Sequence, residues 1–285
     1  MTQKKNVTWF VILAVVLSWP LFLLSLVWPD SVIVDWPLAM FGPGLAAVIV
    51  TRFIARENLS SLNLRRLGPK RFYLWAWLAP PLLAVVALGF TLLLRIGEFD
   101  PTFSFIMSAL PEGVTGVPPW LIALGQLLFV VAVAPLINMV AGGMGEELGW
   151  RGFLLPRLLE LGKWRAILLS NLIWGLWHAP VILQGHNYPE HPVLGVFLMV
   201  GLCVLLGVFL SWLYLETRSP WAPALAQGAF NASAGLPIVF LVPGVNMTLG
   251  GTVASLAGWI GLALLASWLI LSGRLPLPGR GSSRP

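Results

Sequence analysis

The feature that most constrains this chain is a series of apolar runs, several of which reach the roughly 20 residues needed to cross a bilayer core. Of its 285 residues, 58% are hydrophobic and only 10% are charged, which is more apolar surface than a soluble domain could bury. Lipid offers no partner for backbone N–H and C=O groups, so each run must satisfy them internally as a helix. The sequence therefore predicts an all-α, polytopic membrane helix bundle.

Eight apolar runs indicate about eight transmembrane helices. No linker or internal repeat divides them, so we expect one transmembrane domain over residues 1–272. Residues 273–285 are rich in Pro, Gly and Ser, which predicts a flexible cytoplasmic tail. The expected helices cover residues 8–28, 36–54, 72–94, 120–140, 166–183, 193–215, 220–242 and 250–271.

The basic residues are distributed unevenly between the two faces of the predicted bundle. Arg95 is the only Lys or Arg on one face, and all the others lie on the face that carries both termini. The positive-inside rule therefore predicts that this second face is the cytoplasmic face of a plasma-type membrane. The net charge of +6 therefore reflects topology and gives no reason to expect a nucleic-acid partner. The predicted cytoplasmic face carries Lys4, Lys5, Arg52, Arg56, Arg65, Arg66, Lys70, Arg71, Arg151, Arg157, Lys163, Arg165, Arg218, Arg274, Arg280 and Arg284.

The segment GGMGEELGWRGFLLPRL, residues 142–158, places two adjacent carboxylates beside membrane spans. A carboxylate costs about 2.5 to 3.5 kcal/mol at the centre of a spanning helix, so such residues indicate function. On a helix Glu147 and Arg151 share a face and can pair, whereas Glu146 is rotated by about 100° and points elsewhere. The glycines of this segment favour close backbone packing over a solvated loop.

A histidine, His178, lies near the middle of a later apolar run, within WGLWHAP. A lone buried histidine is usually neutral and bonded to a carbonyl. Here consecutive antiparallel helices would bring it close to the carboxylates, where Glu146 and His178 together could hold and deprotonate a water molecule.

Two amides, Gln227 and Asn231, are four residues apart and therefore on one helix face. They could join helices, or they could donate hydrogen bonds to an oxyanion. Asn171 is either such a joining residue or a support for the site. The loop GHNYPEH, residues 185–191, matches no tight ligand spacing, so we interpret it as an ordinary solvated loop and expect no metal there.

Three segments resemble a known family. GEELGWRGFLLPRL is similar to the E-E-x-x-x-R motif of the CAAX prenyl endopeptidase and bacteriocin-processing intramembrane proteases. The spacing of Trp174 and His178 resembles the second motif of that family. TRSPWAPALAQGAFN, residues 217–231, resembles its third motif, H-x-x-x-N after a Ser-x-Trp-x-P entry. The resemblance covers roughly residues 120–232.

The resemblance implies an eight-helix bundle with a site that opens to the cytoplasmic leaflet. It implies that Glu146 and His178 activate water, that Glu147, Arg151 and Trp174 support the site, and that Asn231 binds the oxyanion. The family has been described both as zinc-dependent and as metal-free. The histidine of the third motif is Gln227 here, which donates a hydrogen bond but is a poor zinc ligand, so we expect no cofactor.

Three functions are compatible with the sequence. The first is an endopeptidase that cleaves a membrane-embedded or lipidated peptide, prenylated or bacteriocin-like. The second, favoured by Gln227, is a non-proteolytic relative that acts as a membrane partner or self-immunity protein. The third is a transporter with Glu146 or His178 as its proton site, which the lack of repeats disfavours.

Overall fold

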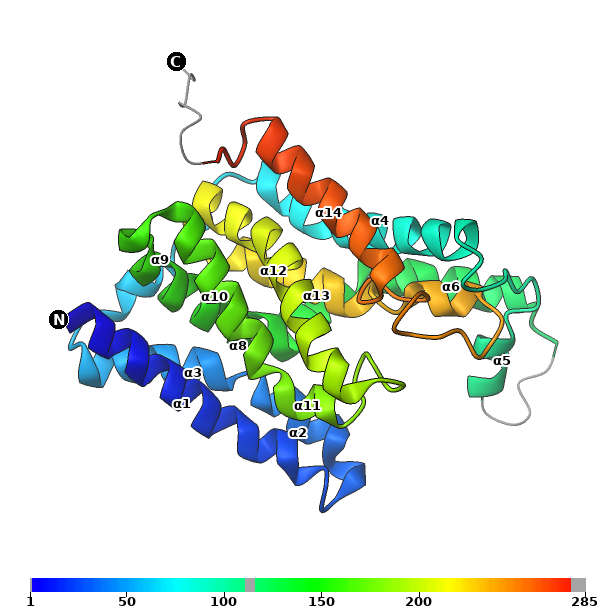
Figure 1. Cartoon of the computed structure of the whole chain (residues 1–285), viewed down its shortest axis with the longest axis horizontal. Coiled ribbons are helices and arrows are strands. Elements are labelled where there is room, and N and C mark those ends of the chain that lie inside the picture. The colour runs from blue at the N-terminus through cyan, green and yellow to red at the C-terminus, as the bar shows by residue number, and fades with distance from the viewer. Residues whose placement is uncertain (1, 111–115, 278–285) are drawn as a thin grey trace.

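The structure, a computed structural model that describes residues 2–110 and 116–277, is an all-helical bundle, and no strand occurs among these residues (Figure 1). One antiparallel bridge joins Phe99 and Leu241. The α-helices are α1 Thr2–Leu24, α2 Val32–Ala39, α3 Gly42–Ile49, α4 Arg71–Leu93, α5 Ser104–Ala109, α6 Pro119–Ala132, α7 Ala134–Asn138, α8 Met144–Glu147, α9 Leu155–Leu158, α10 Lys163–Trp177, α11 Ala179–Leu183, α12 Pro192–Thr217, α13 Trp221–Ser233 and α14 Leu256–Leu271.

Shorter helical segments connect these elements. Val50–Ile54, Met139–Gly143 and Leu148–Leu154 are π-helical, and the last two flank α8 within the glycine-rich motif. π-Helical turns are rare and often lie at functional sites. The 3₁₀ segments are Pro29–Ser31, Leu59–Leu62, Leu159–Leu161 and Leu236–Phe240.

The structure confirms the all-α membrane class, with four helices long and apolar enough to span a bilayer among the residues it describes. A fifth crossing results if Pro119–Ala132 and Ala134–Leu161, bent by 47°, form one span. The helices α10, α13 and α14 have 15, 13 and 16 residues, shorter than the predicted runs. The four long spans are Gln3–Leu24, Trp36–Ile54, Arg71–Leu93 and Pro192–Thr217.

Two of the shorter helices have clear physical reasons for their length. Pro180 has no N–H to continue the hydrogen-bond ladder, so α10 ends at Trp177 and the chain turns at His178. In α13 every residue of 222–230 is buried, so this helix lies inside the bundle and is largely shielded from lipid.

Close backbone contacts hold α13 and α3 against the glycine-rich motif. A Cβ atom added at Gly143 would lie 2.7 Å from the Ala224 carbonyl oxygen, and one at Gly44 would lie 2.7 Å from the Gly145 carbonyl oxygen. A side chain at either position would separate the helices. The close packing predicted from the glycines is therefore confirmed.

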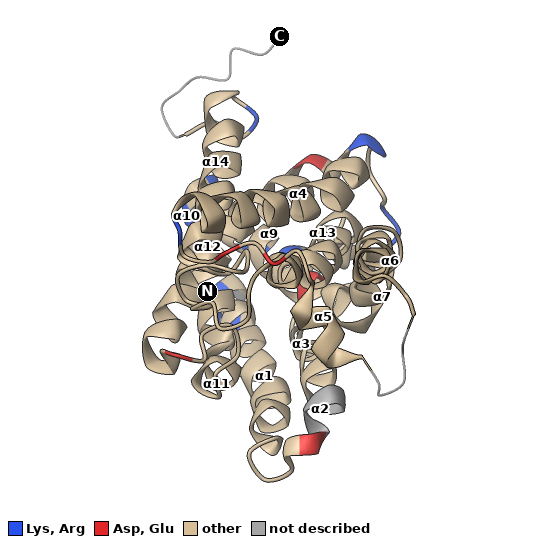
Figure 2. Ribbon diagram, turned by 90° about the vertical axis from the view of Figure 1, so that its right-hand side faces the viewer, with Lys and Arg blue, Asp and Glu red and all other residues tan. Residues whose placement is uncertain are grey.

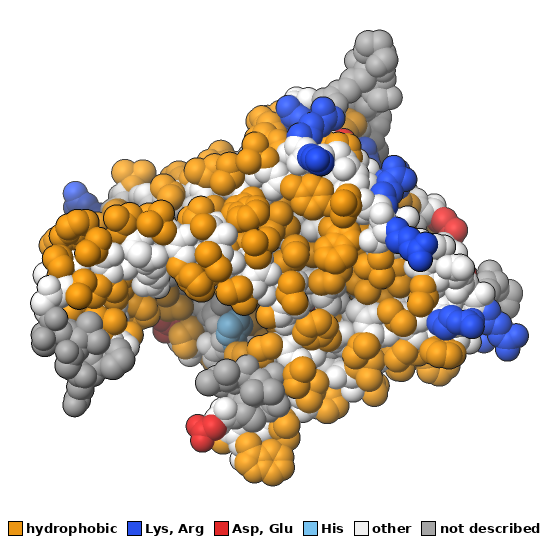
Figure 3. All heavy atoms as spheres, turned by 180° about the vertical axis from the view of Figure 1, so that it is seen from behind, with side chains coloured by type: hydrophobic (Ala, Val, Ile, Leu, Met, Phe, Trp, Pro, Cys, Tyr) orange, Lys and Arg blue, Asp and Glu red, His pale blue; other side chains and the backbone are white. Residues whose placement is uncertain are grey.

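The structure has two chemically different ends. Most Lys and Arg side chains visible in Figure 3 lie along one edge, and charged residues elsewhere are few (Figures 2 and 3). We call this the basic end. Its contacts join Arg157 to Glu57, Gln3 to the Arg157 carbonyl, Trp164 to the Pro276 carbonyl and Trp221 to the Leu64 carbonyl.

The end opposite the basic end has its own polar contacts, which join the connections between helices there. There Ser25 donates to Gln184, and the Met247 N–H donates to Glu190. Tyr188 donates to the Ala254 carbonyl.

The chain beyond α14 packs at the basic end as far as it is described. Leu275 is buried, and Pro276 accepts the hydrogen bond from Trp164. The rest of the predicted flexible tail, residues 278–285, lies outside the described residues.

Candidate functional site

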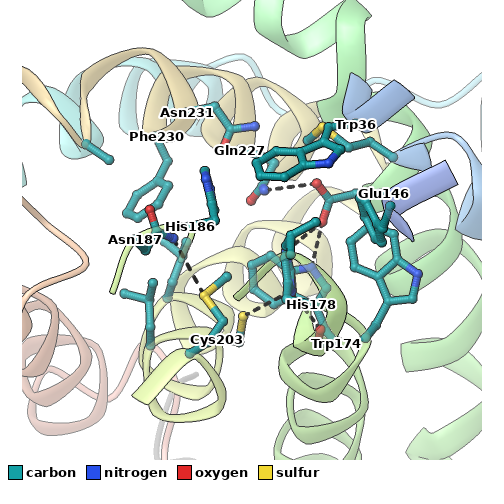
Figure 4. A pocket seen from close by; sticks show the side chains of 18 of the residues that line it. Trp36, Glu146, Trp174, His178, His186, Asn187, Cys203, Gln227, Phe230 and Asn231 are labelled. Atoms are coloured by element: carbon teal, nitrogen blue, oxygen red, sulfur yellow. Dashed lines mark hydrogen bonds and ion pairs between the residues drawn. The ribbon is translucent and has the colours of Figure 1, made fainter. Parts of the chain in front are cut away.

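A cavity of about 580 Å³ brings together all four residues predicted to be catalytic, Glu146, His178, Gln227 and Asn231 (Figure 4). They come from α8, the turn after α10, and α13. Segments up to 85 positions apart in sequence thus meet around one space. The approach of Glu146 and His178 agrees with the expectation from antiparallel neighbouring helices.

Glu146 lies at the cavity wall and is the best supported of the four. Its side chain is only 1% exposed, and its Oε2 accepts a 2.6 Å hydrogen bond from the indole N–H of Trp174. The Oε1 atom accepts a longer one, 3.4 Å, from the Gln227 amide. No ion pair with Lys or Arg involves this carboxylate among the described residues.

His178 faces Glu146 through its Nε2 atom, which lies 4.0 Å from Oε2. Its Nδ1 atom is 2.9 Å from the Trp174 carbonyl oxygen, and a carbonyl only accepts, so we assign the ring proton to Nδ1. The Nε2 lone pair is then free to accept a proton or a hydrogen bond beside the carboxylate. Trp174 thus contacts both groups, Glu146 with its side chain and His178 with its backbone.

Glu147 turns away from the cavity and pairs with Arg151, as predicted, at 2.5 Å between Oε1 and NH1. The other guanidinium nitrogen donates to Asn171 Oδ1 at 2.6 Å. The guanidinium carbon also lies 4.4 Å from the centre of the Trp174 ring. Because Trp174 also binds Glu146, this sealed ion pair holds the indole that positions the cavity carboxylate.

Asn171 has room for this role because Gly207 of α12 lies opposite. A Cβ atom added at Gly207 would fall 2.0 Å from Asn171 Oδ1. The alternative that Asn171 only joins helices is incomplete, since it binds the arginine of the motif directly.

The two amides of α13 occupy different depths. Gln227 is 4% exposed, and its Oε1 atom is buried without a hydrogen-bond partner among the described residues. Asn231 is exposed and lines the same cavity one turn further along the helix. In Figure 4 both amides lie on the same side of the cavity, and Gln227 is the one that contacts Glu146.

The cavity wall includes residues that the sequence interpretation missed. Cys203 of α12 lies with its Sγ 3.9 Å from His178 Nδ1, and Trp36 and Asn187 also contribute. The loop 185–191 is not simply solvated: Tyr188 is fully buried, and the His186 ring packs edge-on to Trp36 at 5.2 Å between centroids. The interpretation as a solvated loop therefore holds for the exposed His186, Glu190 and His191 but missed the burial of Tyr188, for which loop hydropathy held no signal.

The cavity opens at the end of the molecule opposite the basic end. Its lining includes Trp36 of α2, together with His186 and Gly235 of the connections at that end. Figure 3 shows a hollow with a histidine away from the basic edge. Toward the basic end, the fully buried Trp150 and Phe153 close the bundle. The expectation that the site opens on the side of the basic loops therefore disagrees with the structure.

The donor groups at the site do not fit a resident zinc ion. Zinc sites generally use three or more His, Cys, Asp or Glu ligands, and no such group of three occurs among the described residues. Glu146 Oε2 is engaged by Trp174, and the third neighbour, Gln227, is an amide and a weak ligand.

The site thus consists of a buried carboxylate opposite an imidazole within a membrane-type helical bundle. Residues 120–233 match the profile of a family described as "Type II CAAX prenyl endopeptidase Rce1-like", which confirms the resemblance of the three motifs. The chain is also similar to "CAAX prenyl protease 2" of Methanococcus maripaludis, with 26% identity over 199 residues. That match covers 62% of this chain and 64% of the relative, so the chain spans less than two thirds of the relative's length.

These comparisons support a protease at the level of the family and an integral membrane protein. The matched residues contain α8, the turn after α10, and α13, which supply Glu146, His178, Gln227 and Asn231.

Proposed function

We propose that this protein is an intramembrane endopeptidase that hydrolyses a peptide bond in a membrane-embedded or lipidated peptide, prenylated or bacteriocin-like. One observation carries the proposal: Glu146 is buried at the cavity wall opposite His178, while the only arginine nearby, among the described residues, is bound to Glu147. A carboxylate left without a cation in an apolar wall is available as a base.

In the first step Glu146 takes a proton from a water molecule held beside it and His178. The Nε2 lone pair of His178 accepts the second hydrogen bond of this water and orients it. The water oxygen attacks the carbonyl carbon, and the C=O π electrons move to the carbonyl oxygen. Trp174 keeps the carboxylate in place through its 2.6 Å hydrogen bond.

In the second step the tetrahedral intermediate collapses. Asn231 and Gln227 donate hydrogen bonds to the oxyanion, as amides do in oxyanion holes. The C–N bond then breaks, the electron pair goes to nitrogen, and the proton held by Glu146 passes to the leaving amine. Glu147 and Arg151 do not exchange protons in this scheme but keep Trp174 in position.

The same proposal assigns eight crossings to residues 1–272, with both termini in the cytoplasm and the bundle in a plasma-type membrane. The five possible spans would be joined by α10, α13 and α14, which run between the two ends of the bundle. The basic residues of the connections support this orientation. The apolar wall, with Phe22, Trp177 and Phe230, suits an apolar peptide or lipid chain.

The proposal is tested with purified protein in liposomes that also contain a set of apolar membrane peptides. We expect cleavage of at least one peptide, and we expect Glu146→Gln and His178→Ala each to abolish it. Thermal unfolding in detergent establishes that both variants are folded. Wild-type turnover in Glu146→Gln would exclude this carboxylate as the base.

A non-proteolytic membrane partner or self-immunity protein is the second candidate, because Gln227 stands where the resembled family has histidine and its amide contacts Glu146 itself. The variant Gln227→His separates the two. As an oxyanion donor, histidine should preserve or raise cleavage. Absence of cleavage in both the wild type and Gln227→His would favour the second candidate.

A further inference from the structure

The direction of the cavity carries an inference about where its substrate comes from. Each long helix runs between the two ends: α1 starts beside Lys4 and reaches the cavity at Phe22, and α12 contributes Met199 before it ends next to Arg218. The cavity therefore occupies the half of the bundle away from the basic end.

The half of the bundle on the basic side is closed by packed side chains. Trp150, Phe153, Leu154 and Leu155 are each at most 1% exposed, and Phe10 stacks on Phe153 with 4.8 Å between ring centroids. Within the part of the chain that the structure describes, no cavity residue comes from the connections at the basic end. A peptide from that side would have to separate this packed layer to reach Glu146.

The uneven distribution of Lys and Arg between the two ends assigns the basic end to the cytoplasmic side. Among the short connections at the opposite end, only Arg95 is basic, and these connections include Asp100 and Glu190. Excess Lys and Arg in short loops retains them in the cytoplasm. Arg151 does not contribute to this count, since it is fully buried in its ion pair.

We infer that the cavity is entered from the extracytoplasmic side of the membrane, so that its substrate is an exported peptide or the outward part of a membrane-anchored one. That the bound peptide is cleaved rests on the proposed function. The side of entry does not, because it follows from the cavity and the charge distribution alone.

The cavity lining also limits the charge of that peptide. Glu146 is the one acidic side chain among the described lining residues, and no Lys or Arg lines the cavity among them. A negative charge brought into this space would lose its hydration and find no Lys or Arg in the described lining to compensate it. The bound segment is therefore neutral or positively charged.

Cysteine labelling tests the side of entry directly. Gly235 is exposed at the mouth, and a Cβ atom there meets nothing within 4 Å, so Gly235→Cys is a reporter with little expected strain. His186→Cys is a second mouth reporter, and the exposed Arg165→Cys reports the basic end. The parent protein, whose single cysteine Cys203 is buried, gives the background.

Intact cells and inverted membrane vesicles are treated with a membrane-impermeant maleimide. We expect Gly235→Cys and His186→Cys to react in intact cells, and Arg165→Cys to react only in inverted vesicles. Reaction of the mouth reporters only in inverted vesicles would overturn the inference. A mouth reporter that fails to accumulate is replaced by the other.

Cleavage is then measured with a peptide whose apolar segment carries Lys at both ends, added to the outside of right-side-out or inverted vesicles. We expect turnover at least about tenfold higher in right-side-out vesicles, and higher than for the same segment flanked by Glu. Outward labelling without cleavage of any peptide would contradict the proteolytic function and leave the side of entry standing. Equal cleavage of the Lys and Glu peptides would overturn the charge limit.

Discussion

Glu146 and Glu147 are adjacent in sequence, equally buried, and placed in opposite surroundings. Glu146 faces a cavity of about 580 Å³ with an imidazole and an amide as neighbours. Glu147 faces the interior, where Arg151 neutralises it. A rotation of about 100° between consecutive helical residues is enough to separate a reactive carboxylate from a structural one.

The comparison also separates two kinds of energetic contribution. Removing one partner of a buried ion pair leaves an uncompensated charge and is strongly destabilising. A buried carboxylate without a cation is itself unfavourable, so neutralising it should not destabilise the fold. Substitution by glutamine should therefore lower the free energy of unfolding at Glu147 but not at Glu146.

The largest expected effect is on catalysis at Glu146. Glu146→Gln removes the base and should lower turnover by about 10² to 10⁴-fold, the usual contribution of general base catalysis. The melting temperature in detergent should stay the same or rise. The matched control is Glu160→Gln, an exposed glutamate at the basic end, which should keep wild-type turnover. A fall in stability equal to that of Glu147→Gln would remove the distinction between the two carboxylates.

The second expected effect is on stability at Glu147. Glu147→Gln leaves Arg151 buried without a counterion, which should cost about 3 to 5 kcal/mol of unfolding free energy. The double variant Glu147→Gln with Arg151→Met removes both charges and should recover much of that loss. Chemical or thermal unfolding of the three proteins measures the coupling. Additive losses in the double variant would show that the pair contributes no specific stabilisation.

A smaller effect is expected at Trp174, which connects the two carboxylate environments. Trp174→Phe keeps a ring under the Arg151 guanidinium but removes the N–H that binds Glu146. Loss of one hydrogen bond to a charged group, about 1.5 kcal/mol, corresponds to roughly tenfold lower turnover. The KM should change little, because Trp174 positions the base. A large change in KM with constant kcat would instead assign Trp174 to substrate binding.

The smallest effect concerns a third carboxylate, Asp100, which lies in the connection after α4 outside the membrane spans. Hydroxyl hydrogen bonds from Ser104 and Thr102, assisted by their backbone N–H groups, hold the pKa of Asp100 well below its usual range. A lowered folded-state pKa stabilises the fold above the unfolded pKa, about 3.9, and the contribution is lost as pH falls through the folded pKa.

Melting curves of the wild type and Asp100→Asn should therefore differ slightly and constantly from pH 7 down to about pH 4, with the wild type more stable. Below that pH the two curves should converge. A difference that grows as the pH falls would contradict the assignment. Because Asp100 is remote from the motif, turnover at pH 7 should be unchanged, unlike that of the Glu146 variant.

Much of the architecture could be predicted from the sequence because lipid restricts apolar runs to helices. The runs 166–183 and 220–242 were predicted too long as continuous helices. Hydropathy does not register that Pro180 interrupts the first or that α13 is buried within the bundle. The approach of Glu146 and His178 was expected from antiparallel neighbouring helices, whereas only the family resemblance placed Gln227 and Asn231 at the same site. In the structure all four line one cavity.

The direction of the cavity could not be predicted, for a physical reason that Arg151 illustrates. In sequence it resembles a loop charge at the cytoplasmic face, which places the motif near that face. In the structure it is 0% exposed and neutralised within the bundle, so it gives no information on the surface. Tyr188 shows the reverse case, because a residue expected to be solvated is buried. Hydropathy cannot distinguish its buried hydroxyl, bound to a carbonyl, from a solvated one.

The π-helical segments on either side of α8 have a consequence for how the motif can vary. Each π turn contains roughly one residue more than an α turn, so the helix changes phase by about 100° as it passes through Met139–Gly143 and again through Leu148–Leu154. The extra residue in each π-helical segment sets the direction in which α8 faces α13 relative to the direction in which Arg151 points. The length of the motif therefore matters to its geometry as much as its chemistry: a single deletion within either π-helical segment should turn Glu146 out of the cavity.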